Sequence, residues 1–285
     1  MMKIINLIED TKGAGVCVPA HGLSFYIETD AHKLLVDLGP SEETLNNAEK
    51  LGIDIAGVDT VVLSHGHYDH SGGIMPFVRR NNTAKIYMQR TAVGDFWSDD
   101  GETSGGERYR YIGIDGGIAK LPQVVFVDGD CRIDDELELF TVKHANHPIP
   151  SANKTLFVKS GGRLMQDSFD HEHYLAVRDG DRRILVSGCA HKGMLNIMEA
   201  FAVRYKTAPD MVISGFHLMK KGEYTEEERR EIADMAEKLK EYPTEYVTCH
   251  CTGIKAYEIM KGVMGEKLKV VHSGDCILSG DERHL

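Results

Sequence analysis

Residues 61–73, VVLSHGHYDHSGG, place three histidines and one aspartate within six positions, directly after an apolar β-branched run. The four side chains are His65, His67, Asp69 and His70. Imidazole and carboxylate groups are common protein ligands of divalent metal ions. Residues two apart in an extended or turning segment point the same way, so His65 and His67 can hold one ion. Asp69 and His70 are then available for a second ion nearby.

Two metal ions at a spacing of roughly 3.5–4 Å share a bridging water and act together on one reacting centre. They lower the pKa of that water and polarise a carbonyl or phosphoryl oxygen, which is the chemistry of hydrolysis or of phosphoryl departure. The alternative interpretation is a polar surface turn whose histidines are satisfied by other hydrogen bonds. With 14 histidines in 285 residues, the spacing H-x-H-x-D-H rarely arises by chance. The motif therefore predicts a dinuclear metal site.

Three later strand-like runs end in the same way as the run that precedes His65. ILVSG leads to Cys189 and His191, MVISG leads to His217, and EYVTC leads to His250. Ligands gather at the carboxyl ends of strands in open α/β sheets, so we expect these side chains to converge on one site. A lone histidine near a strand end is usually structural, but several in parallel contexts favour a shared site.

The elements that must position these residues alternate between strands and helices. Helices are expected at 41–53, with Ser41 as the N-cap, at 194–206, and at 224–242, where Thr225 and Glu228 form a capping box. Extended segments are expected at 21–29, 33–39, 60–64, 123–129 and 136–142, and in a hairpin across Asp179-Gly180-Asp181. Two runs of strands, each followed by helices, predict an α/β fold with two mixed sheets packed face to face and helices outside.

Neither an internal repeat nor a Pro/Ser-rich linker interrupts the chain, so we expect one domain over residues 1–285. Residues 94–117 are rich in glycine and polar residues yet contain the single tryptophan, which indicates a lid loop. Arg108, Tyr109 and Arg110 are its candidate substrate-binding residues, because arginines clamp phosphates and a tyrosine ring stacks on flat ligands. An exposed basic and aromatic surface loop is the alternative.

The charge balance of 33 basic against 44 acidic residues gives a net charge of −11, which disfavours sequence-independent binding of nucleic acid. No apolar run approaches the length of about 18 residues needed to span a membrane. The first ten residues, MMKIINLIED, meet acidic residues too early for a secretory signal, so we expect a cytoplasmic protein with free thiols. The sequence leaves the oligomeric state open.

The segment T-x-x-L-S-H-x-H-x-D-H-x-G-G at residues 60–73 resembles the signature of the metallo-β-lactamase fold superfamily, and the whole chain is compatible with its αββα sandwich. Within the superfamily the chain is most similar to the 7,8-dihydropterin-6-methyl-4-(β-D-ribofuranosyl)aminobenzene-5'-phosphate synthase-like group. The supporting segments are HGLS at 21–24, VDLGPSEETLNNAEKLGID at 36–54, SGCAHKGMLN at 187–196, GFHL at 215–218 and HCTG at 250–253. Pro40 occupies a position that this group more often fills with Gln.

The resemblance implies that His65 and His67 hold one ion, while Asp69 and His70 hold the other. His191 is the expected third ligand of the first site, and His250 is the expected distal ligand of the second. Other superfamily members place the third histidine before the strand that ends in ILVSG, so four histidines compete with His191: His144, His147, His171 and His173.

Cys189 stands where the superfamily often has a bridging aspartate, and it either coordinates metal or packs as a small buried residue. Glu172 is expected to anchor a loop or to support a ligand from behind, as are His21 and Ser24. Asp69 and His217 are the candidate catalytic residues; a His217 satisfied by backbone carbonyls is the alternative. Cys249 and Cys251 flank His250, so in a strand both would point away from it and serve packing.

Imidazole-rich sites suit zinc, with Mn²⁺, Fe²⁺ and Ni²⁺ as alternatives to two Zn²⁺ ions. His67 stands where diiron flavoprotein relatives carry Glu, which disfavours reduction of O₂ or NO. We therefore expect a metal-dependent hydrolase that uses a metal-bound hydroxide on a small anionic metabolite, namely a phosphoester, lactone or thioester. One alternative is a pterin-type synthase or transferase with metal-assisted departure of diphosphate. A non-catalytic metal-binding regulatory protein is the other.

Overall fold

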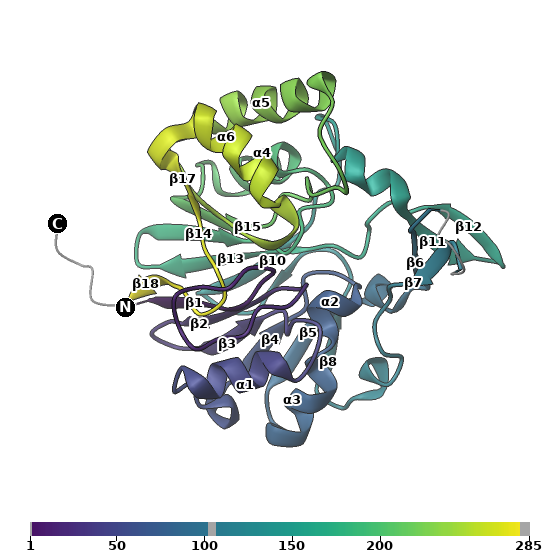
Figure 1. Cartoon of the computed structure of the whole chain (residues 1–285). Coiled ribbons are helices and arrows are strands. Elements are labelled where there is room, and N and C mark those ends of the chain that lie inside the picture. Colours follow the sequence, from purple (N-terminus) through teal and green to yellow (C-terminus); the bar gives the residue numbers. More distant parts are fainter. Residues whose placement is uncertain (1, 102–106, 280–285) are drawn as a thin grey trace.

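The computed structural model of the chain describes residues 2–101 and 107–279 (Figure 1). Its α-helices are α1 (Glu43–Lys50), α2 (Tyr68–Ser71), α3 (Ile74–Arg80), α4 (Met194–Tyr205), α5 (Glu226–Lys240) and α6 (Ile254–Met264). Over the described residues, two seven-stranded sheets lie face to face. Helices α1 and α3 cover the outer face of one sheet, and α4, α5 and α6 cover the other. The predicted αββα sandwich is confirmed.

The first sheet is mixed. Its strands, in order across the sheet, are β18 (Cys276–Ser279), β1 (Lys3–Ile8), β2 (Ser24–Glu28), β3 (Lys33–Val36), β4 (Thr60–Val62), β5 (Lys85–Gln89) and β8 (Val124–Val127). Strands β3, β4, β5 and β8 run parallel, whereas β18, β1 and β2 pair antiparallel. Burial is nearly continuous along β2, β3 and β4. Layers cover both faces, which explains why these runs are apolar without alternation.

The second sheet is also mixed. Its strands, in order, are β17 (Leu268–Val270), β16 (Glu245–Thr248), β15 (Met211–Ser214), β14 (Arg182–Val186), β13 (Tyr174–Asp179), β10 (Leu137–Phe140) and β9 (Cys131–Arg132). The four strands from β14 to β17 are parallel. Strands β13 and β14 form the predicted hairpin, in which Gly180 adopts a φ of +62° that favours glycine.

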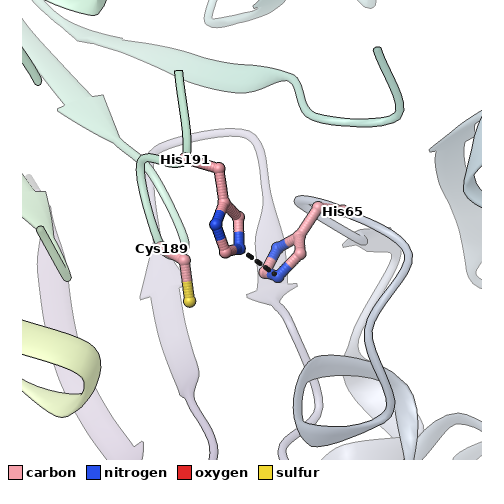
Figure 2. Close-up of side chains that lie close together, drawn as sticks. All are labelled: His65, Cys189 and His191. Atoms are coloured by element: carbon pink, nitrogen blue, oxygen red, sulfur yellow. Dashed lines mark hydrogen bonds between the residues drawn. The ribbon is translucent and has the colours of Figure 1, made fainter. Parts of the chain in front are cut away.

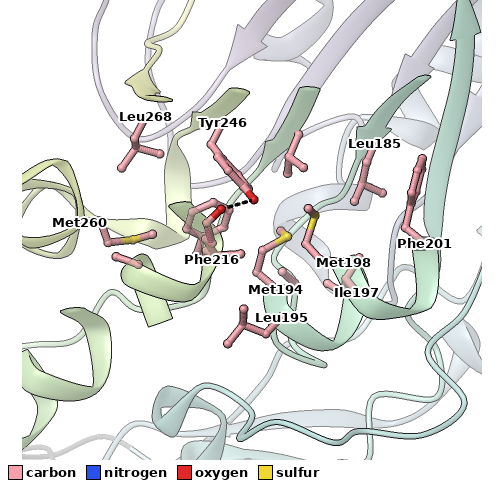
Figure 3. Packing of buried hydrophobic residues seen from close by; sticks show 14 of the residues in the cluster. Leu185, Met194, Leu195, Ile197, Met198, Phe201, Phe216, Tyr246, Met260 and Leu268 are labelled. Atoms are coloured by element: carbon pink, nitrogen blue, oxygen red, sulfur yellow. Dashed lines mark hydrogen bonds between the residues drawn. The ribbon is translucent and has the colours of Figure 1, made fainter. Parts of the chain in front are cut away.

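Three layers of buried side chains hold the sandwich together. The layer between the sheets includes Phe25, Val36, Leu175, Val186 and Ile213. Helix α4 places Met194, Met198 and Phe201 against Leu185 and Tyr246 on the outer face of the second sheet (Figure 3). Full burial of a side chain of this size stabilises the fold by about 1.5–3 kcal/mol. The strand ends that carry the predicted ligands therefore project from a rigid, packed base.

Two helix starts test the predicted caps. Helix α5 begins with the predicted capping box, in which the Thr225 hydroxyl accepts the Glu228 N–H and the Glu228 carboxylate accepts the Thr225 N–H. Helix α1 begins later than expected, at Glu43, and Glu42 rather than Ser41 occupies its N-cap position. The hydroxyl of Ser41 instead accepts the N–H of Glu43 at 3.3 Å, as in a local turn.

A third, four-stranded sheet was not predicted. Its order is β12 (Arg163–Gln166), β11 (Leu156–Ser160), β6 (Phe96–Asp99) and β7 (Tyr109–Tyr111). Strands β6 and β7 belong to the predicted lid at 94–117, of which residues 102–106 lie outside the described residues. The small sheet projects from the end of the sandwich near α2 (Figure 1). Sequence patterns missed it because β6 pairs with β11, a strand far along the chain.

The strand ends that carry the candidate ligands come from both large sheets. Strand β4, before His65, lies in the first sheet, while β14, β15 and β16 are neighbours in the second. The predicted convergence therefore occurs across the two sheets and not along one sheet edge. Within residues 2–101 and 107–279, none of the helices combines the length and apolar character needed to cross a bilayer.

Candidate metal centre

The HGHYDH turn joins the end of β4 to the single helical turn α2. His65 and His67 precede α2, whereas Asp69 and His70 lie within it. Gly66 allows this turn to pack closely, because a Cβ there would lie 2.5 Å from the carbonyl oxygen of Ala92. The four side chains are buried, so the turn is an interior feature and not a polar surface loop.

The first group of donor atoms consists of His65, His67 and His191. The Nε2 atoms of His65 and His191 face each other at 3.4 Å (Figure 2). The His67 ring lies 4.5 Å from the His65 ring and 5.1 Å from the His191 ring, measured between centroids. Its Nε2 is buried and has no hydrogen-bond partner among the described residues.

The second group consists of Asp69, His70 and His250. The Oδ2 atom of Asp69 lies 3.7 Å from Nε2 of His70 and 3.6 Å from Nε2 of His250. Like His67, His250 has a buried Nε2 without a hydrogen-bond partner in the described chain. Both groups therefore leave an imidazole nitrogen available in a closed, polar space.

Cys189 lies between the two groups. Its Sγ is 3.2 Å from Nε2 of His70. It also lies within 4.8 Å of donor atoms of His65 and His191 on one side and of His70 and His250 on the other. A bridging ligand would occupy this position, and the burial of Cys189 to 3% exposure also fits a small packing residue.

Four of the histidines are oriented through Nδ1, which leaves Nε2 facing the centre. The Nδ1 partners are Ser64 for His65, Asp37 for His70, Asn153 for His191 and Asp10 for His250, at 2.8, 2.6, 2.9 and 2.5 Å. Metal-binding histidines are held in this way, because a partner on one ring nitrogen sets the tautomer and the direction of the other.

Burial shifts the pKa values of the first group. It lowers the pKa of His65 and His191 well below the usual range and that of His67 to about 3. These imidazoles are neutral, which is the form that binds metal ions. For Asp69, burial alone would raise the pKa, but the neighbouring His70 lowers it far below the usual range, so the carboxylate is ionised.

In the second group, nearby carboxylates outweigh burial. Burial alone would lower the pKa of His70, but the charges of Asp37 and Asp69 raise it. Burial alone would likewise lower the pKa of His250, but its hydrogen bond to Asp10 and the nearby Asp69 carboxylate raise it. A cation is thus stabilised here, which is the electrostatic condition that a divalent ion needs.

The structure separates His191 from its four competitors. Both ring nitrogens of His171 are engaged: Nδ1 accepts the Gly66 N–H at 2.9 Å, and Nε2 donates to Asp167 at 3.0 Å. His173 donates from Nε2 to the Leu63 carbonyl, and its Nδ1 lies 3.2 Å from the Gln89 amide. His144 is exposed and His147 is half-buried. His171 does form a further donor group with His67 and Asp167, but only His191 of these five directs Nε2 at His65.

Glu172 anchors the loop that carries His191. It accepts the N–H groups of His191 and Lys192 at 2.8 and 3.0 Å and the Tyr174 hydroxyl at 2.5 Å. Behind the same loop, the Phe169 ring stacks on His191 with centroids 4.5 Å apart and an interplanar angle of 3°. These contacts place Glu172 in the loop-anchoring position that the sequence suggested.

Three further candidates lie around the two groups. His21 is half exposed, donates from Nδ1 to Asp10 at 2.8 Å and places Nε2 3.7 Å from Asp69. The Ser24 hydroxyl donates to the backbone carbonyl of Asp37 at 2.7 Å, behind the partner of His70. His217 packs its ring 4.2 Å from the His191 ring and has a buried Nδ1 without a partner among the described residues.

The predicted substrate-binding residues lie on the small sheet. Arg108 pairs with Asp99 and Arg110 pairs with Asp100, at 2.6 and 2.7 Å. Tyr109 contacts Phe157, with ring centroids 6.1 Å apart. Arg110 also lies over the ring of Tyr68, which separates the ligand candidates His67 and Asp69 in sequence. Arg110 is therefore the member of the trio that the structure brings next to the metal turn.

Sequence reasoning missed the oxygen acceptors behind the histidines, above all Glu9 and Asp10. They follow the buried strand β1 directly, so the same strand-end pattern that pointed to His65 could have found them. Glu9 accepts a hydrogen bond from the backbone N–H of His250 at 3.0 Å, and Asp10 accepts one from the Nδ1–H of its ring. Two adjacent carboxylates thus hold both the backbone and the ring of one candidate ligand.

Strained backbone is concentrated at this centre. Among the described residues, non-glycine positive φ values occur at Asp37, Phe169, Ala190, Lys206, His217 and His250, and all but Lys206 belong to the segments described above. Such conformations cost about 1–3 kcal/mol each and are retained where a site requires them.

A model of the metallo-beta-lactamase superfamily matches residues 18–242. The chain belongs to this superfamily. The predicted family, fold and enzyme class are confirmed at that level, and membership in the metallo-β-lactamase superfamily implies bound metal ions. The residues present fit such ions, because unpartnered Nε2 atoms, neutral imidazoles and a thiol surround an ionised carboxylate.

Similar proteins span nearly the whole length of this metallo-β-lactamase superfamily member. A 7,8-dihydropterin-6-methyl-4-(beta-D-ribofuranosyl)-aminobenzene-5'-phosphate synthase of Methanocaldococcus jannaschii is 27% identical over 303 residues, covering 97% of this chain and 96% of that protein. The crystal structure of Tm1679, a metal-dependent hydrolase of the beta-lactamase superfamily, has a TM-score of 0.80 at 28% identity and covers 98% of this chain and 99% of that one. Zn²⁺-bound PqqB from Methylobacterium extorquens shares the fold, with a TM-score of 0.57 at 13% identity over 98% of this chain and 100% of that one.

Proposed function

We propose that the chain is a dinuclear metal-dependent hydrolase of a small anionic metabolite. The observation that carries the proposal is the placement of Cys189 between two donor groups whose histidines are oriented through Nδ1. His65, His67 and His191 would hold one ion, Asp69, His70 and His250 the other, and Cys189 both. The donor set of imidazole, thiolate and carboxylate favours Zn²⁺ over Mn²⁺, Fe²⁺ or Ni²⁺.

Bound at these residues, two divalent ions would supply the Lewis acidity that activates water and polarises a substrate oxygen. The protein residues would set the geometry of that chemistry. Asp69 is ionised and presents Oδ2 to the second group, so it can accept a hydrogen bond from the attacking water. His217 lies beside His191 at a half-buried position, where it can donate a proton to a leaving group.

Cationic side chains near the candidate centre support an anionic substrate. Arg110 lies over Tyr68 in the metal turn. A cavity of 330 Å³ adjoins the His191 loop, and its lining includes the cationic Arg90 and Lys192 and the carboxylates of Asp128, Asp170 and Glu172. Arg110 pairs with Asp100 and Lys192 pairs with Asp170, so a substrate anion would have to compete with these carboxylates.

A pterin-type synthase is the second candidate, because the similarity to the Methanocaldococcus jannaschii synthase extends over nearly the full length of both chains. In that reaction an arylamine would attack a pterin substrate as diphosphate leaves. The same donor groups could stabilise the departing diphosphate, and the arginines of the small sheet could hold its phosphates.

The test is a substrate panel with zinc-loaded protein. We expect metal-dependent turnover of a phosphomonoester, phosphodiester, lactone or thioester, and loss of that turnover in His65→Ala. Release of diphosphate from a dihydropterin diphosphate and an arylamine, without hydrolysis in the panel, would instead establish the synthase. Tight metal binding without turnover in either assay would contradict both and leave a non-catalytic metal-binding protein.

A further inference from the structure

A separate group of sulfur and nitrogen donors lies beside the proposed dinuclear centre. It consists of Cys189, Cys251 and His217, whose two Sγ atoms and one ring nitrogen all lie within 4.8 Å of one another. The three residues follow β14, β16 and β15, which are adjacent parallel strands of the second sheet. The proposed function uses Cys189 and His217, but it gives no role to Cys251.

The backbone is arranged around the sulfur of Cys251. Strand β16 ends at Thr248, and Cys251 lies in a 3₁₀ turn (His250–Thr252), so the strand alternation that suggested a packing role does not apply to it. Its Sγ accepts the His217 N–H at 3.2 Å. A Cβ at Gly215 would lie 2.4 Å from this Sγ, so the sulfur occupies space that only glycine leaves open.

His217 contributes a ring nitrogen that the protein itself leaves unsatisfied. Its Nδ1 is buried and lacks a hydrogen-bond partner in the described part of the chain. His217 also adopts a left-handed backbone conformation, with a φ of +46°. A buried polar atom without a partner is costly, as is this conformation, and a bound ligand at the ring would offset both.

Cys249 provides the internal comparison. It lies two residues from Cys251 and is buried to the same degree, with 3% of its surface exposed against 4%. Its side chain packs in the apolar layer between the sheets with Val247 and Ile213. One of the two cysteines that flank His250 is therefore a core residue, and the other faces donor atoms.

Two sulfur atoms and one imidazole make a softer donor set than the histidine and carboxylate groups next to it. Thiolates select Cu⁺ and Cd²⁺ and also bind Zn²⁺, whereas carboxylate-containing sites suit harder ions. We propose that Cys189, Cys251 and His217 form a soft-metal site that competes with the dinuclear centre for Cys189. Each thiol releases its proton to solvent when it binds the ion, and no electron transfer is involved.

Occupation of this site would draw the Cys189 sulfur away from the two donor groups that it otherwise bridges. A soft ion would then weaken metal binding at the dinuclear centre without occupying the His65 or Asp69 positions. The site shares Cys189 and His217 with the proposed hydrolytic function, but cadmium binding can be tested without a substrate.

The test is a titration of the zinc-loaded protein with CdCl₂, followed by the ultraviolet charge-transfer absorption of cadmium–thiolate bonds. This absorption grows with the number of bound thiolates, so we expect Cys251→Ala to show about half the absorbance per cadmium of the unmodified protein. Cys249→Ala is the matched control and should retain the full absorbance. Full absorbance in Cys251→Ala, or an equal loss in Cys249→Ala, would overturn the proposal.

A second measurement uses the unmodified protein, so it tests the Cys251 thiolate even if the Cys251→Ala variant does not fold. Cadmium should slow the alkylation of Cys251 during a long incubation of the folded protein with a thiol-alkylating reagent, which peptide mass mapping can measure residue by residue. The exposed Cys276 provides the reference for unprotected alkylation. Equal alkylation of Cys251 with and without cadmium would exclude its thiolate as a ligand.

Discussion

Asp10 and His250 are 240 residues apart in the chain, and their side chains meet in a 2.5 Å hydrogen bond between Oδ1 and Nδ1. Asp10 also accepts the Nδ1–H of His21 through its other oxygen. The loop after the first strand and the turn after β16 are thereby joined at the candidate centre. This contact makes the orientation of His250 depend on the N-terminal segment.

The first prediction follows from that contact. Asp10→Ala removes the acceptor that fixes the His250 ring, so we expect affinity for the second ion to fall about 10–100-fold while the first ion stays bound. Metal analysis after dialysis against graded metal buffers measures this. Asp181→Ala, in the exposed β13–β14 turn, is the control. An unchanged affinity for both ions in Asp10→Ala would contradict the positioning role.

Substitution of the proposed ligands themselves has a larger expected effect. We predict that His65→Ala or Asp69→Ala lowers the metal content and reduces activity by more than about 100-fold, because even residues behind the ligands cost 10–100-fold. The packed sheets do not depend on these side chains, so far-UV circular dichroism should change little. Full two-ion occupancy in both variants would refute the ligand assignment.

Cys189 offers a test of the bridging position. Cys189→Ala should lose about half of the bound metal, because one bridging donor is removed from between the two groups. Cys189→Asp places a carboxylate, the more frequent bridging group of the superfamily, at the same position and should restore two-ion binding. Replacing the metal with cobalt reports directly on a metal–thiolate bond at Cys189. At low cobalt load, the cobalt–thiolate charge-transfer band should be absent in Cys189→Asp and present in the control, Cys249→Ala. If Cys189 only packs as a small buried residue, Cys189→Ala should keep its normal metal content.

Two cationic side chains, Arg110 and Lys192, are candidates for binding the anionic group of the substrate, and substitutions can separate them. If the small sheet binds a phosphate, Arg110→Ala should raise KM for a phosphorylated substrate about tenfold or more, because charge-assisted hydrogen bonds are stronger than neutral ones. If the cavity behind His191 binds it, Lys192→Ala should have that effect. Arg108→Ala is the comparison within the sheet. Unchanged kcat/KM in all three variants would remove the proposed anion contacts.

A pH-dependent contribution to stability is expected at His32, far from the centre. Burial alone would lower the pKa of His32, but hydrogen bonds to Asp59 at 2.8 Å and Asp134 at 2.6 Å raise it. A raised folded-state pKa means that the stabilisation is complete below the unfolded value of about 6.5 and is lost as pH rises through the folded value. Wild type should therefore exceed His32→Gln in unfolding free energy mainly at acidic pH.

Urea unfolding of both proteins across the pH range measures this difference. His144→Gln, at an exposed histidine, is the control and should follow the wild-type profile. A difference between wild type and His32→Gln that does not depend on pH would mean that the protonated imidazole is not what joins Asp59 to Asp134.

Much of the fold follows from local patterns along the chain. The capping box at Thr225, the Gly180 hairpin and the apolar strands before His65 and His250 each depend on neighbours in sequence. The small sheet does not, because β6 pairs with β11 about sixty residues later, and nothing in either short strand specifies the partner. The N-cap of α1 is Glu42, one residue later than the predicted Ser41, because the Ser41 hydroxyl accepts a hydrogen bond within a turn instead of capping the helix.

For the candidate centre, the sequence alone determined the donor chemistry, since the spacing of His65, His67, Asp69 and His70 needs no knowledge of other segments. Only the tertiary structure decided which distant groups complete it. It directs His191 rather than His171 toward His65, places Asp10 behind His250, and turns Cys251 toward Cys189. The physical reason is twofold. Strand order determines which distant residues lie next to a ligand, and the hydrogen-bond partner of one ring nitrogen of a histidine determines where the other nitrogen points. The spacing of one motif specifies neither.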